Sequence, residues 1–414
     1  MLRPVFASTL LALSLTLTVG WLSAAPATAE APAAALTVGH IDTLRSEILD
    51  EERTLTVRLP DGYATGDARF PVLYLLDPQS HFHYLTGILQ ELERQGHMPS
   101  LIVVGIANTE RTRDLTPPWT DESTIEAQGG RAQIIPDGGG GDAFLRFLSD
   151  ELIPHVDKTY RTEPYRLLVG HSFGGLFALH ALATTPDLFR SILAISPSLW
   201  WDTGRPVDRL ESLFEQRPTL QTQLFATVGN ESGLMIDPFN RLQALLRYRA
   251  PSGLHWHAKV YDAEDHGTMP IPSTYAALRF FFDGWQIPYD LVGWDVEAVD
   301  AHFAGLSSRF GYPVSAGEAV INGFGYRALF SEEVDKAIEI FQVNVDRYPG
   351  SANVYDSLGE AVEANGELER AFELYRRAYT MAKDAGADAA DPSLVAYQRH
   401  MEAVSEKIAD VKAE

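Results

Sequence analysis

The chain of 414 residues contains no cysteine. This absence excludes disulfide bonds, zinc sites built on cysteine and a catalytic thiol. Basic residues are also scarce, because 33 Lys and Arg stand against 56 Asp and Glu, which gives a formal net charge of −23 at pH 7. Nucleic-acid surfaces and anionic membrane surfaces are bound through clustered Lys and Arg. The charge therefore argues against both kinds of partner.

A long apolar run is missing as well. The apolar run at residues 10–19 is about half of the roughly 20 residues that a membrane-spanning helix needs. Arg3 precedes it, and Ala27 and Ala29 offer a small-residue cleavage site, which is the layout of a secretory signal peptide. We expect residues 1–29 to be removed and residues 30–38 to form a flexible tail. The mature protein is then periplasmic or secreted, without a membrane span.

The rest of the chain has the 45% hydrophobic and 10% aromatic content of an ordinary globular protein. Between residues 36 and 287, apolar runs of strand length alternate with segments of helical period, which predicts a mostly parallel sheet covered on both faces. In such an α/β fold the ligand lies at the carboxyl ends of the strands. The expected strands are 53–60, 71–77, 101–107, 166–170, 191–196, 224–229 and 256–261, and the expected helices include 143–156, 173–182 and 274–285.

The stretch "LLVGHSFGGLFALHAL" carries the main chemical signal. Gly170 and Gly174 lie two residues before and after Ser172, between an apolar strand and an apolar helix. This is the G-x-S-x-G spacing of a nucleophile elbow, in which side chains at the flanking positions would collide across the turn. The pattern predicts that Ser172 is a nucleophile. The alternative is a serine at a tight strand-to-helix crossover.

A serine nucleophile needs a histidine that is oriented by a carboxylate. His266 follows the last expected strand and precedes the closing helix, so it is the predicted base. His171 lies inside the elbow and is expected to line the turn and the substrate site. The remaining histidines include two pairs with i, i+2 spacing, at 81 and 83 and at 255 and 257, but neither pair has a nearby third ligand. We expect neither a metal nor an organic cofactor.

The acid of the triad is expected in the loop after the strand at 224–229, since the order Ser, acid, His is that of α/β-hydrolases. That loop reads "VGNESGLMID" and contains Glu231, the best placed candidate, and Asp237, the second. Asp202, Asp262 and Asp265 are weaker alternatives.

An oxyanion hole needs two backbone donors. The first is expected to be the N–H of Phe173, directly after the nucleophile. The second should come from the loop "DPQSHF" after the strand at 71–77, where Pro78 has no N–H and the donor must be Gln79 or Ser80. Trp200 and Trp201 follow another strand end, and they are predicted either to wall an acyl site or to pack in the core.

Six segments occur in an order that resembles a known family. They are "VLYLLD", "RTRDLTP", "VGHSFGGLFALHAL", "SPSLWWD", "VGNES" and "DHGTMPIPSTYAALRFFF". Together they resemble the esterase family that contains esterase D, the enterochelin esterases and the mycolyltransferases, over residues 39–285.

The resemblance implies an α/β-hydrolase that acts on an ester or thioester, in a domain that we place at residues 39–290. It puts Ser172, Glu231 and His266 at the positions of the triad. It also implies that Arg113 and Asp114 border the substrate site.

The C-terminal region contains a repeat of 34 residues. The matching pairs are Gly325 and Gly359, Ala337 and Ala371, Phe341 and Tyr375, and Asn344 and Ala378. This period and these small residues are typical of tetratricopeptide repeats. We therefore predict an all-helical domain at residues 295–414 that packs on the hydrolase or binds a protein partner.

Together these patterns predict an exported serine ester hydrolase whose substrate is a small molecule. A siderophore lactone and a carbohydrate-linked acyl ester both fit. The alternative is a catalytically weak hydrolase scaffold whose helical repeats mediate protein–protein interaction.

Overall fold

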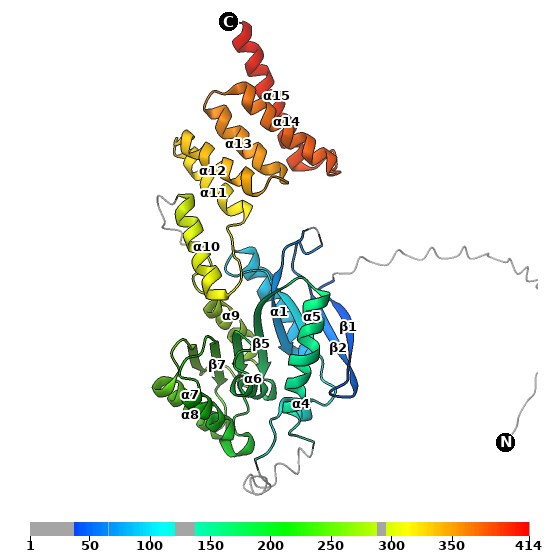
Figure 1. Ribbon diagram of the computed structural model, residues 1–414, viewed down its shortest axis with the longest axis vertical. Coiled ribbons are helices and arrows are strands. Elements are labelled where there is room, and N and C mark those ends of the chain that lie inside the picture. The colour runs from blue at the N-terminus through cyan, green and yellow to red at the C-terminus, as the bar shows by residue number, and fades with distance from the viewer. Residues whose placement is uncertain (1–36, 65, 121–136, 288–294, 414) are drawn as a thin grey trace, which may run out of the picture. The chain divides into compact units, whose positions relative to one another are not determined.

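The computed structural model describes residues 37–64, 66–120, 137–287 and 295–413 (Figure 1). The expected signal peptide and nearly all of the expected tail lie outside these ranges, as does the expected boundary between the two domains. Among the helices in these ranges, none combines the length and apolar character that crossing a membrane requires.

The first part of the chain alternates strands and helices, and the second part is helical. The strands are β1 (His40–Ser46), β2 (Glu51–Arg58), β3 (Phe70–Leu76), β4 (Ile102–Ile106), β5 (Thr162–His171), β6 (Ser191–Ile195), β7 (Gln223–Gly229) and β8 (His255–Tyr261). The helices among them are α1 (Pro78–Arg94), α2 (Arg111–Leu115), α4 (Gly141–Arg146), η2 (Phe147–Leu152), α5 (Ile153–Thr159), α6 (Phe173–Thr184), η3 (Trp201–Gly204), α7 (Arg205–Gln216), α8 (Gly233–Arg249) and α9 (Pro270–Phe281). The later helices are α10 (Val296–Phe310), α11 (Glu318–Phe330), α12 (Val334–Arg347), α13 (Ala352–Ala364), α14 (Leu368–Asp384) and α15 (Pro392–Ala413).

The eight strands form one sheet in the order β1-β2-β4-β3-β5-β6-β7-β8. The strands from β4 across to β8 are parallel, whereas β2 is antiparallel to both β1 and β4. The expected α/β fold with a mostly parallel sheet is therefore confirmed. The edge strand β1 was not expected, because its residues are mostly exposed and lack an apolar run.

Alternate residues of the central strands pack on opposite faces of the sheet, as the two-residue period of a strand requires. Leu73 and Leu75 of β3 belong to one apolar cluster, together with residues of α1 and α9. Tyr74 and Leu76 belong to a second cluster with residues of α4 to α8. Figure 1 shows helices on both sides of β5 and β7. Burial on both faces explains why these strands read as continuous apolar runs.

The expected helix at 143–156 is interrupted. It consists of α4, a π-helical stretch η2 and α5, so one longer helix carries a change of pitch in its middle. The expected strand at 166–170 is also longer in the structure, because β5 begins at Thr162.

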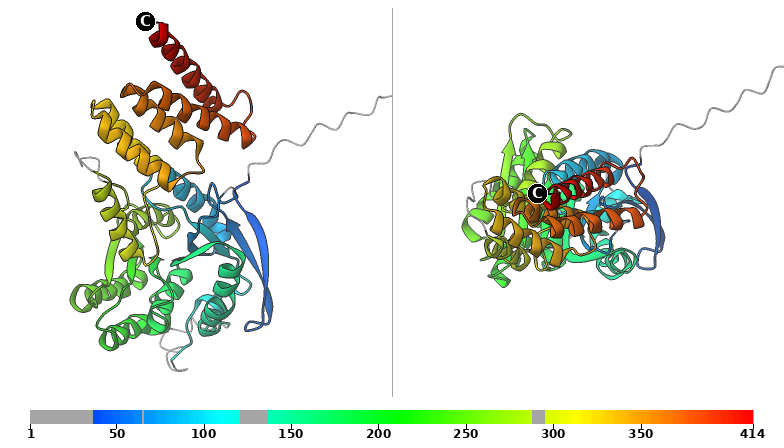
Figure 2. Two further views of the ribbon diagram at one scale, coloured as in Figure 1. Left: turned by 45° about the horizontal axis from the view of Figure 1, so that its top comes forward. Right: turned by 90° about the horizontal axis from the view of Figure 1, so that it is seen from above.

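In the helical region, α11 pairs with α12 and α13 pairs with α14 (Figure 2). The two pairs have an equivalent close contact. A Cβ atom on Gly325 would lie 2.4 Å from the Phe341 ring, and one on Gly359 would lie 2.7 Å from the Tyr375 ring. Only glycine fits at either position, because real Cβ atoms essentially never approach another atom this closely. The 34-residue sequence period thus corresponds to a repeated packing unit.

Helix α10 packs against the sheet domain through aromatic rings. Phe310 is 2% exposed, and its ring centroid lies 5.3 Å from that of Tyr165, 5.5 Å from that of Phe282 and 5.4 Å from that of Trp285. Residues of α10 and of the sheet domain therefore share one apolar cluster.

We expect Phe310→Ala to lower the free energy of unfolding by about 3 to 5 kcal/mol, because it leaves a cavity in this shared cluster. Turnover of a small ester at 25 °C should be unchanged, since the three aromatic partners of Phe310 are not residues of the candidate site. Chemical denaturation and initial rates measure the two effects. Phe330→Ala is the matched control, because Phe330 is 81% exposed. An equal loss of stability in both variants would contradict the assignment of this contact.

Candidate active site

Ser172 lies in a sharp turn between β5 and α6. Its backbone has φ 61° and ψ −116°, a strained conformation for a residue with a side chain. The turn is held by hydrogen bonds from Ser172 N–H to the Ile195 carbonyl (2.9 Å) and from Ser198 N–H to the Ser172 carbonyl (3.2 Å). This is the geometry expected for a nucleophile elbow.

The two glycines around Ser172 are not equally constrained. A Cβ atom on Gly170 would lie 2.1 Å from the Gly174 carbonyl oxygen, so no side chain fits there. A Cβ atom on Gly174 would meet its nearest neighbours at 3.4 Å, which is ordinary van der Waals contact. The expectation that side chains would collide at both positions is therefore correct only for Gly170. The second tight position is Gly175, where a Cβ would lie 2.9 Å from the Ile195 carbonyl oxygen.

The loops after β7 and β8 bring Glu231 and His266 together. His266 Nδ1 lies 2.7 Å from Glu231 Oε2, while Glu231 Oε1 accepts hydrogen bonds from Ser196 Oγ (2.6 Å) and Gly229 N–H (3.2 Å). Burial raises the pKa of the Glu231 carboxyl, but the hydrogen bonds from His266 and Ser196 outweigh it and hold this pKa below its ordinary value. Glu231 is thus a carboxylate that orients the imidazole and leaves Nε2 available.

The serine and the histidine lie on adjacent loops without a hydrogen bond between their side chains. Ser172 Oγ lies 3.4 Å from Ser198 Oγ, and no hydrogen bond joins it to His266, both of which the structure describes. Catalytic hydrogen bonds of this kind are often long before substrate binds and shorten in the complex.

The other acidic candidates have different surroundings. Asp237 is exposed on α8, and Asp262 is exposed after β8. Asp202 is buried and accepts a hydrogen bond from the Thr120 backbone (3.1 Å). Asp265 accepts hydrogen bonds from the backbone N–H groups of Gly267 (2.8 Å) and Thr268 (2.9 Å), so it shapes the loop that carries His266.

His171 lies beside the candidate base. Its Nε2–H donates to the His266 carbonyl oxygen (2.9 Å), and its ring centroid lies 4.6 Å from that of His266 and 5.4 Å from that of His81. Burial, followed by the neighbouring His266 and His81, lowers the pKa of His171 to about 4. His171 is therefore neutral at neutral pH, and it supports the backbone of the His266 loop.

This lowered pKa predicts how stability depends on pH. The folded-state pKa of His171 is about 4 and its ordinary value is 6.5, so the unfolded chain binds the proton first as the pH falls. The stability that a neutral His171 contributes is present above pH 6.5 and is lost between pH 6.5 and 4, by at most about 1.4 kcal/mol per pH unit. We expect His171→Gln to show a shallower fall of Tm in this window than wild type. His83→Gln, at an exposed position of α1, is the control, and equal pH slopes in all three proteins would refute the prediction.

Two backbone N–H groups are the candidate oxyanion donors. Phe173 is the first residue of α6, where a helix leaves its N–H groups unpaired. In the loop after β3, Ser80 N–H donates to the Asp77 carbonyl (3.1 Å), whereas Gln79 N–H has no partner among the described residues. Of the two alternatives in this loop, Gln79 is therefore the available donor.

Sequence reasoning missed an ion pair that holds this loop. Asp77, whose φ is 52°, accepts hydrogen bonds from Arg111 Nε (2.7 Å) and Nη2 (2.9 Å) and a further one from Asn108. The Arg111 guanidinium also lies 5.5 Å from the centroid of the Phe173 ring. The position of Asp77 directly after a strand was the available signal.

The expected substrate residues Arg113 and Asp114 form a different network. Asp114 is fully buried and accepts from Arg53 (2.7 Å), while Arg113 donates to Asp114 (2.8 Å) and to Glu51 (2.9 Å). The hydrogen bonds of Arg113 and Asp114 therefore connect α2 to β2. In the segment "RTRDLTP", Arg111 is the arginine that reaches the loop beside the nucleophile.

The two tryptophans after β6 differ in exposure. Trp201 is buried, its Nε1–H donates to the Pro117 carbonyl (3.0 Å), and its ring stacks on Trp119 with centroids 4.0 Å apart. Trp200 is half-buried, with its ring centroid 5.9 Å from that of Phe173. Trp201 therefore packs in the core, and Trp200 lies nearer the elbow.

Comparison with known proteins gives consistent matches. The family model described as "Putative esterase" matches residues 46–266, which is more than half of the chain. The chain is 36% identical over 146 residues to the ferri-bacillibactin esterase BesA of Bacillus subtilis and 37% identical over 156 residues to a siderophore enterobactin esterase of Emericella nidulans. These matches cover 33% and 34% of this chain, and the chain spans 50% of the length of each relative.

One solved structure is similar to this chain over a larger share of its length. The IroE-like serine hydrolase from Shewanella oneidensis matches with a TM-score of 0.63 and 30% identity, over 74% of this chain and 98% of that one. Together with the family model, this match shows that the chain belongs to the family described as Putative esterase.

Proposed function

We propose that this protein is a serine ester hydrolase with the triad Ser172, His266 and Glu231. The observation that carries the proposal is the pairing of Glu231 with His266 Nδ1 at 2.7 Å, on the loops next to a serine with the backbone of a nucleophile elbow. This arrangement has the three roles that acyl transfer needs: a nucleophile, a base and a carboxylate that orients the base.

The reaction proceeds in two halves. Ser172 Oγ attacks the ester carbonyl carbon while His266 Nε2 takes its proton, and the resulting oxyanion accepts hydrogen bonds from the N–H groups of Phe173 and Gln79. His266 then protonates the alcohol oxygen as the C–O bond breaks, which leaves an acyl-enzyme. Water, deprotonated by His266, attacks the acyl carbon, and His266 returns the proton to Ser172 Oγ as the acyl C–O bond breaks, which releases the acid and restores the serine hydroxyl.

The substrate that we favour is a siderophore ester. Two relatives at 36% and 37% identity are named as siderophore esterases. Aromatic rings beside the elbow, from Phe173 and Trp200, suit an acyl group that contains a ring. A carbohydrate-linked acyl ester is the other substrate class that this site admits.

We further propose export and a repeat module. The charged residue, apolar run and cleavage motif of residues 1–29 support export of the mature protein. The two helix pairs with equivalent glycine–aromatic contacts 34 residues apart support tetratricopeptide-like repeats in α11–α14.

The proposed activity is tested by a fluorophosphonate probe followed by peptide mass spectrometry. We expect a single adduct on Ser172 and competition by a slowly hydrolysed ester. Hydrolysis is then compared for a siderophore lactone, a feruloylated sugar and short aryl esters. Absence of labelling in a folded protein, together with no hydrolysis of any of these esters, would refute the proposal. It would favour the scaffold alternative.

A further inference from the structure

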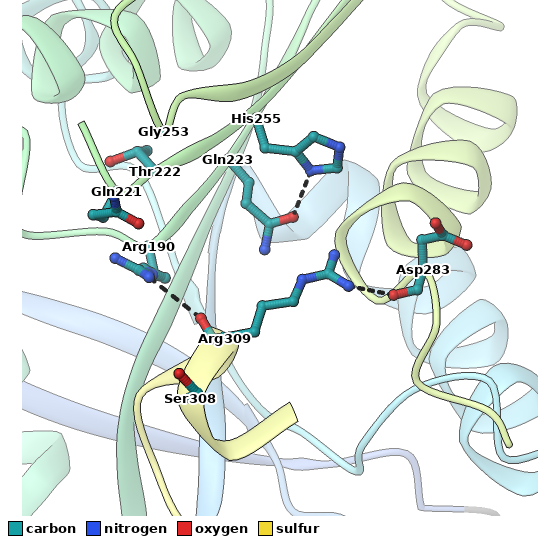
Figure 3. A pocket seen from close by; sticks show the side chains of 9 residues that line it. All are labelled: Arg190, Gln221, Thr222, Gln223, Gly253, His255, Asp283, Ser308 and Arg309. Atoms are coloured by element: carbon teal, nitrogen blue, oxygen red, sulfur yellow. Dashed lines mark hydrogen bonds between the residues drawn. The ribbon is translucent and has the colours of Figure 1, made fainter. Parts of the chain in front are cut away.

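A polar cavity of about 470 Å³ lies at the amino ends of the strands, away from the candidate active site (Figure 3). The residues that line it come from the segments before β6, β7 and β8, from the first residues of β7 and β8, from the loop after α9 and from the end of α10. They are Arg190, Gln221, Thr222, Gln223, Gly253, His255, Asp283, Ser308 and Arg309. Gln223 begins β7, and Glu231 follows its other end. Seven residues of strand separate the two sites by about 20 Å.

Two arginines give the cavity its positive charge. Arg190 Nη2 donates to the Arg309 carbonyl (3.3 Å), and the Arg309 guanidinium donates to the carbonyl of Phe281 (3.1 Å) and to that of Asp283. Within the described ranges, neither guanidinium forms an ion pair with a carboxylate. The Asp283 side chain also lines the cavity, and Figure 3 shows its carboxylate directed away from the Arg309 guanidinium.

Other arginines of the described chain do have carboxylate partners. Arg58, for example, has a carboxylate partner at 2.8 Å, and Arg53 has one at 2.7 Å. Burial raises the pKa of the Tyr165 hydroxyl, and the positive charges of Arg309 and Arg190 partly offset this rise. Two positive charges therefore point into one cavity without an anionic partner from the described chain.

Guanidinium N–H groups without a partner among the described residues lie in the same space. A guanidinium has five N–H groups, and Arg190 uses one of them in the described structure. The Gln223 amide donates to Tyr165 Oη (3.2 Å) and accepts from His255 Nδ1 (3.3 Å), which places it between His255 and Arg309 (Figure 3). The remaining N–H groups of the two guanidinium groups match a ligand with several oxygen acceptors.

We propose that this cavity binds a small multivalent oxyanion, either a polycarboxylate or a polyphosphate, between Arg190 and Arg309. Two guanidinium groups favour two or more negative charges on the ligand, and the volume exceeds what a monovalent ion fills. Because Arg190 precedes β6 and Arg309 lies in the last turn of α10, the bound anion bridges the sheet and α10. Binding therefore raises the stability of the folded chain.

Isothermal titration with citrate and with pyrophosphate, in metal-free buffer at constant low ionic strength, tests the site in the whole mature protein. We expect one anion per chain and a rise in Tm of about 5 °C near 100 times the Kd. Arg190→Gln should weaken binding about tenfold or more, because it removes one charged donor. Ser308→Glu should do the same by placing a negative charge in the cavity, and it removes no contact, because Ser308 is exposed.

Arg247→Gln is the matched control, since Arg247 is exposed on α8 outside the cavity. Binding of citrate alone would identify a polycarboxylate site, and binding of pyrophosphate alone a polyphosphate site. The proposal is overturned if neither anion binds wild type at 10 mM, on the order of the weakest affinity expected for two charged contacts. It is also overturned if both cavity variants bind like the control, or if chloride at equal ionic strength gives the same Tm rise. Hydrolysis of a small aryl ester by every variant separates this result from the proposed catalytic function.

Discussion

Ser172→Ala is expected to lower kcat for ester hydrolysis by about 10⁴ to 10⁶, and His266→Ala by a similar factor. Each change removes the covalent route, because the nucleophile has no substitute and a serine hydroxyl is a poor nucleophile without its base. The double variant should be no slower than either single variant, since residues that act as one unit are not additive. Initial rates on a small aryl ester measure all three.

Ser198→Ala is the matched control for the nucleophile. Its hydroxyl lies 3.4 Å from Ser172 Oγ, so it occupies nearly the same surroundings without standing in the elbow. We expect it to retain most of the activity. Turnover near the wild-type rate in Ser172→Ala, with the fold intact by circular dichroism, would end the proposed mechanism.

Glu231→Gln is expected to lower kcat by about 10² to 10⁴, because the amide cannot stabilise the imidazolium that forms when His266 accepts the proton. Asp237→Asn is the matched control, since Asp237 is exposed on α8 and follows the same strand. It should change kcat little. Glu231→Asp should recover part of the rate by retaining the charge.

A purely structural role for Glu231 predicts a different outcome. Weaker hydrogen bonds from Ser196 and Gly229 to the uncharged amide would then lower Tm in Glu231→Gln without a specific loss in kcat at 25 °C. The comparison of Tm with kcat separates the two roles. The reverse ranking of the Glu231 and Asp237 variants would transfer the acid to Asp237.

Much of the fold was predictable because its signals are local. Strands buried on both faces must be apolar throughout, so β3, β4, β6 and β7 appear as short apolar runs. Strand β1 has no such run, since it lies at the sheet edge with mostly exposed residues, and it was missed. The π-helical stretch η2 was missed as well, because such stretches are rare and a short one has no distinct sequence signal.

The site was predictable to a smaller extent. Gly170 could be read from the sequence because the constraint on it comes from residues four positions away in the same turn. The choice between Arg111 and Arg113 could not, because both lie in one short helix and differ only in the side of the helix from which they extend. Arg111 extends to Asp77, and Arg113 extends to Asp114 and Glu51.

The sequence by itself determined the alternation of strands and helices, the strand–turn–helix around Ser172 and the 34-residue period of the C-terminal helices, since each depends on spacing along the chain. Only the tertiary structure decided which residues meet from distant segments. It brought Glu231 to His266, Arg111 to Asp77, and Arg190 to the end of α10. These contacts join residues between 34 and 119 positions apart, where hydrophobic periodicity carries no information about which polar side chains meet.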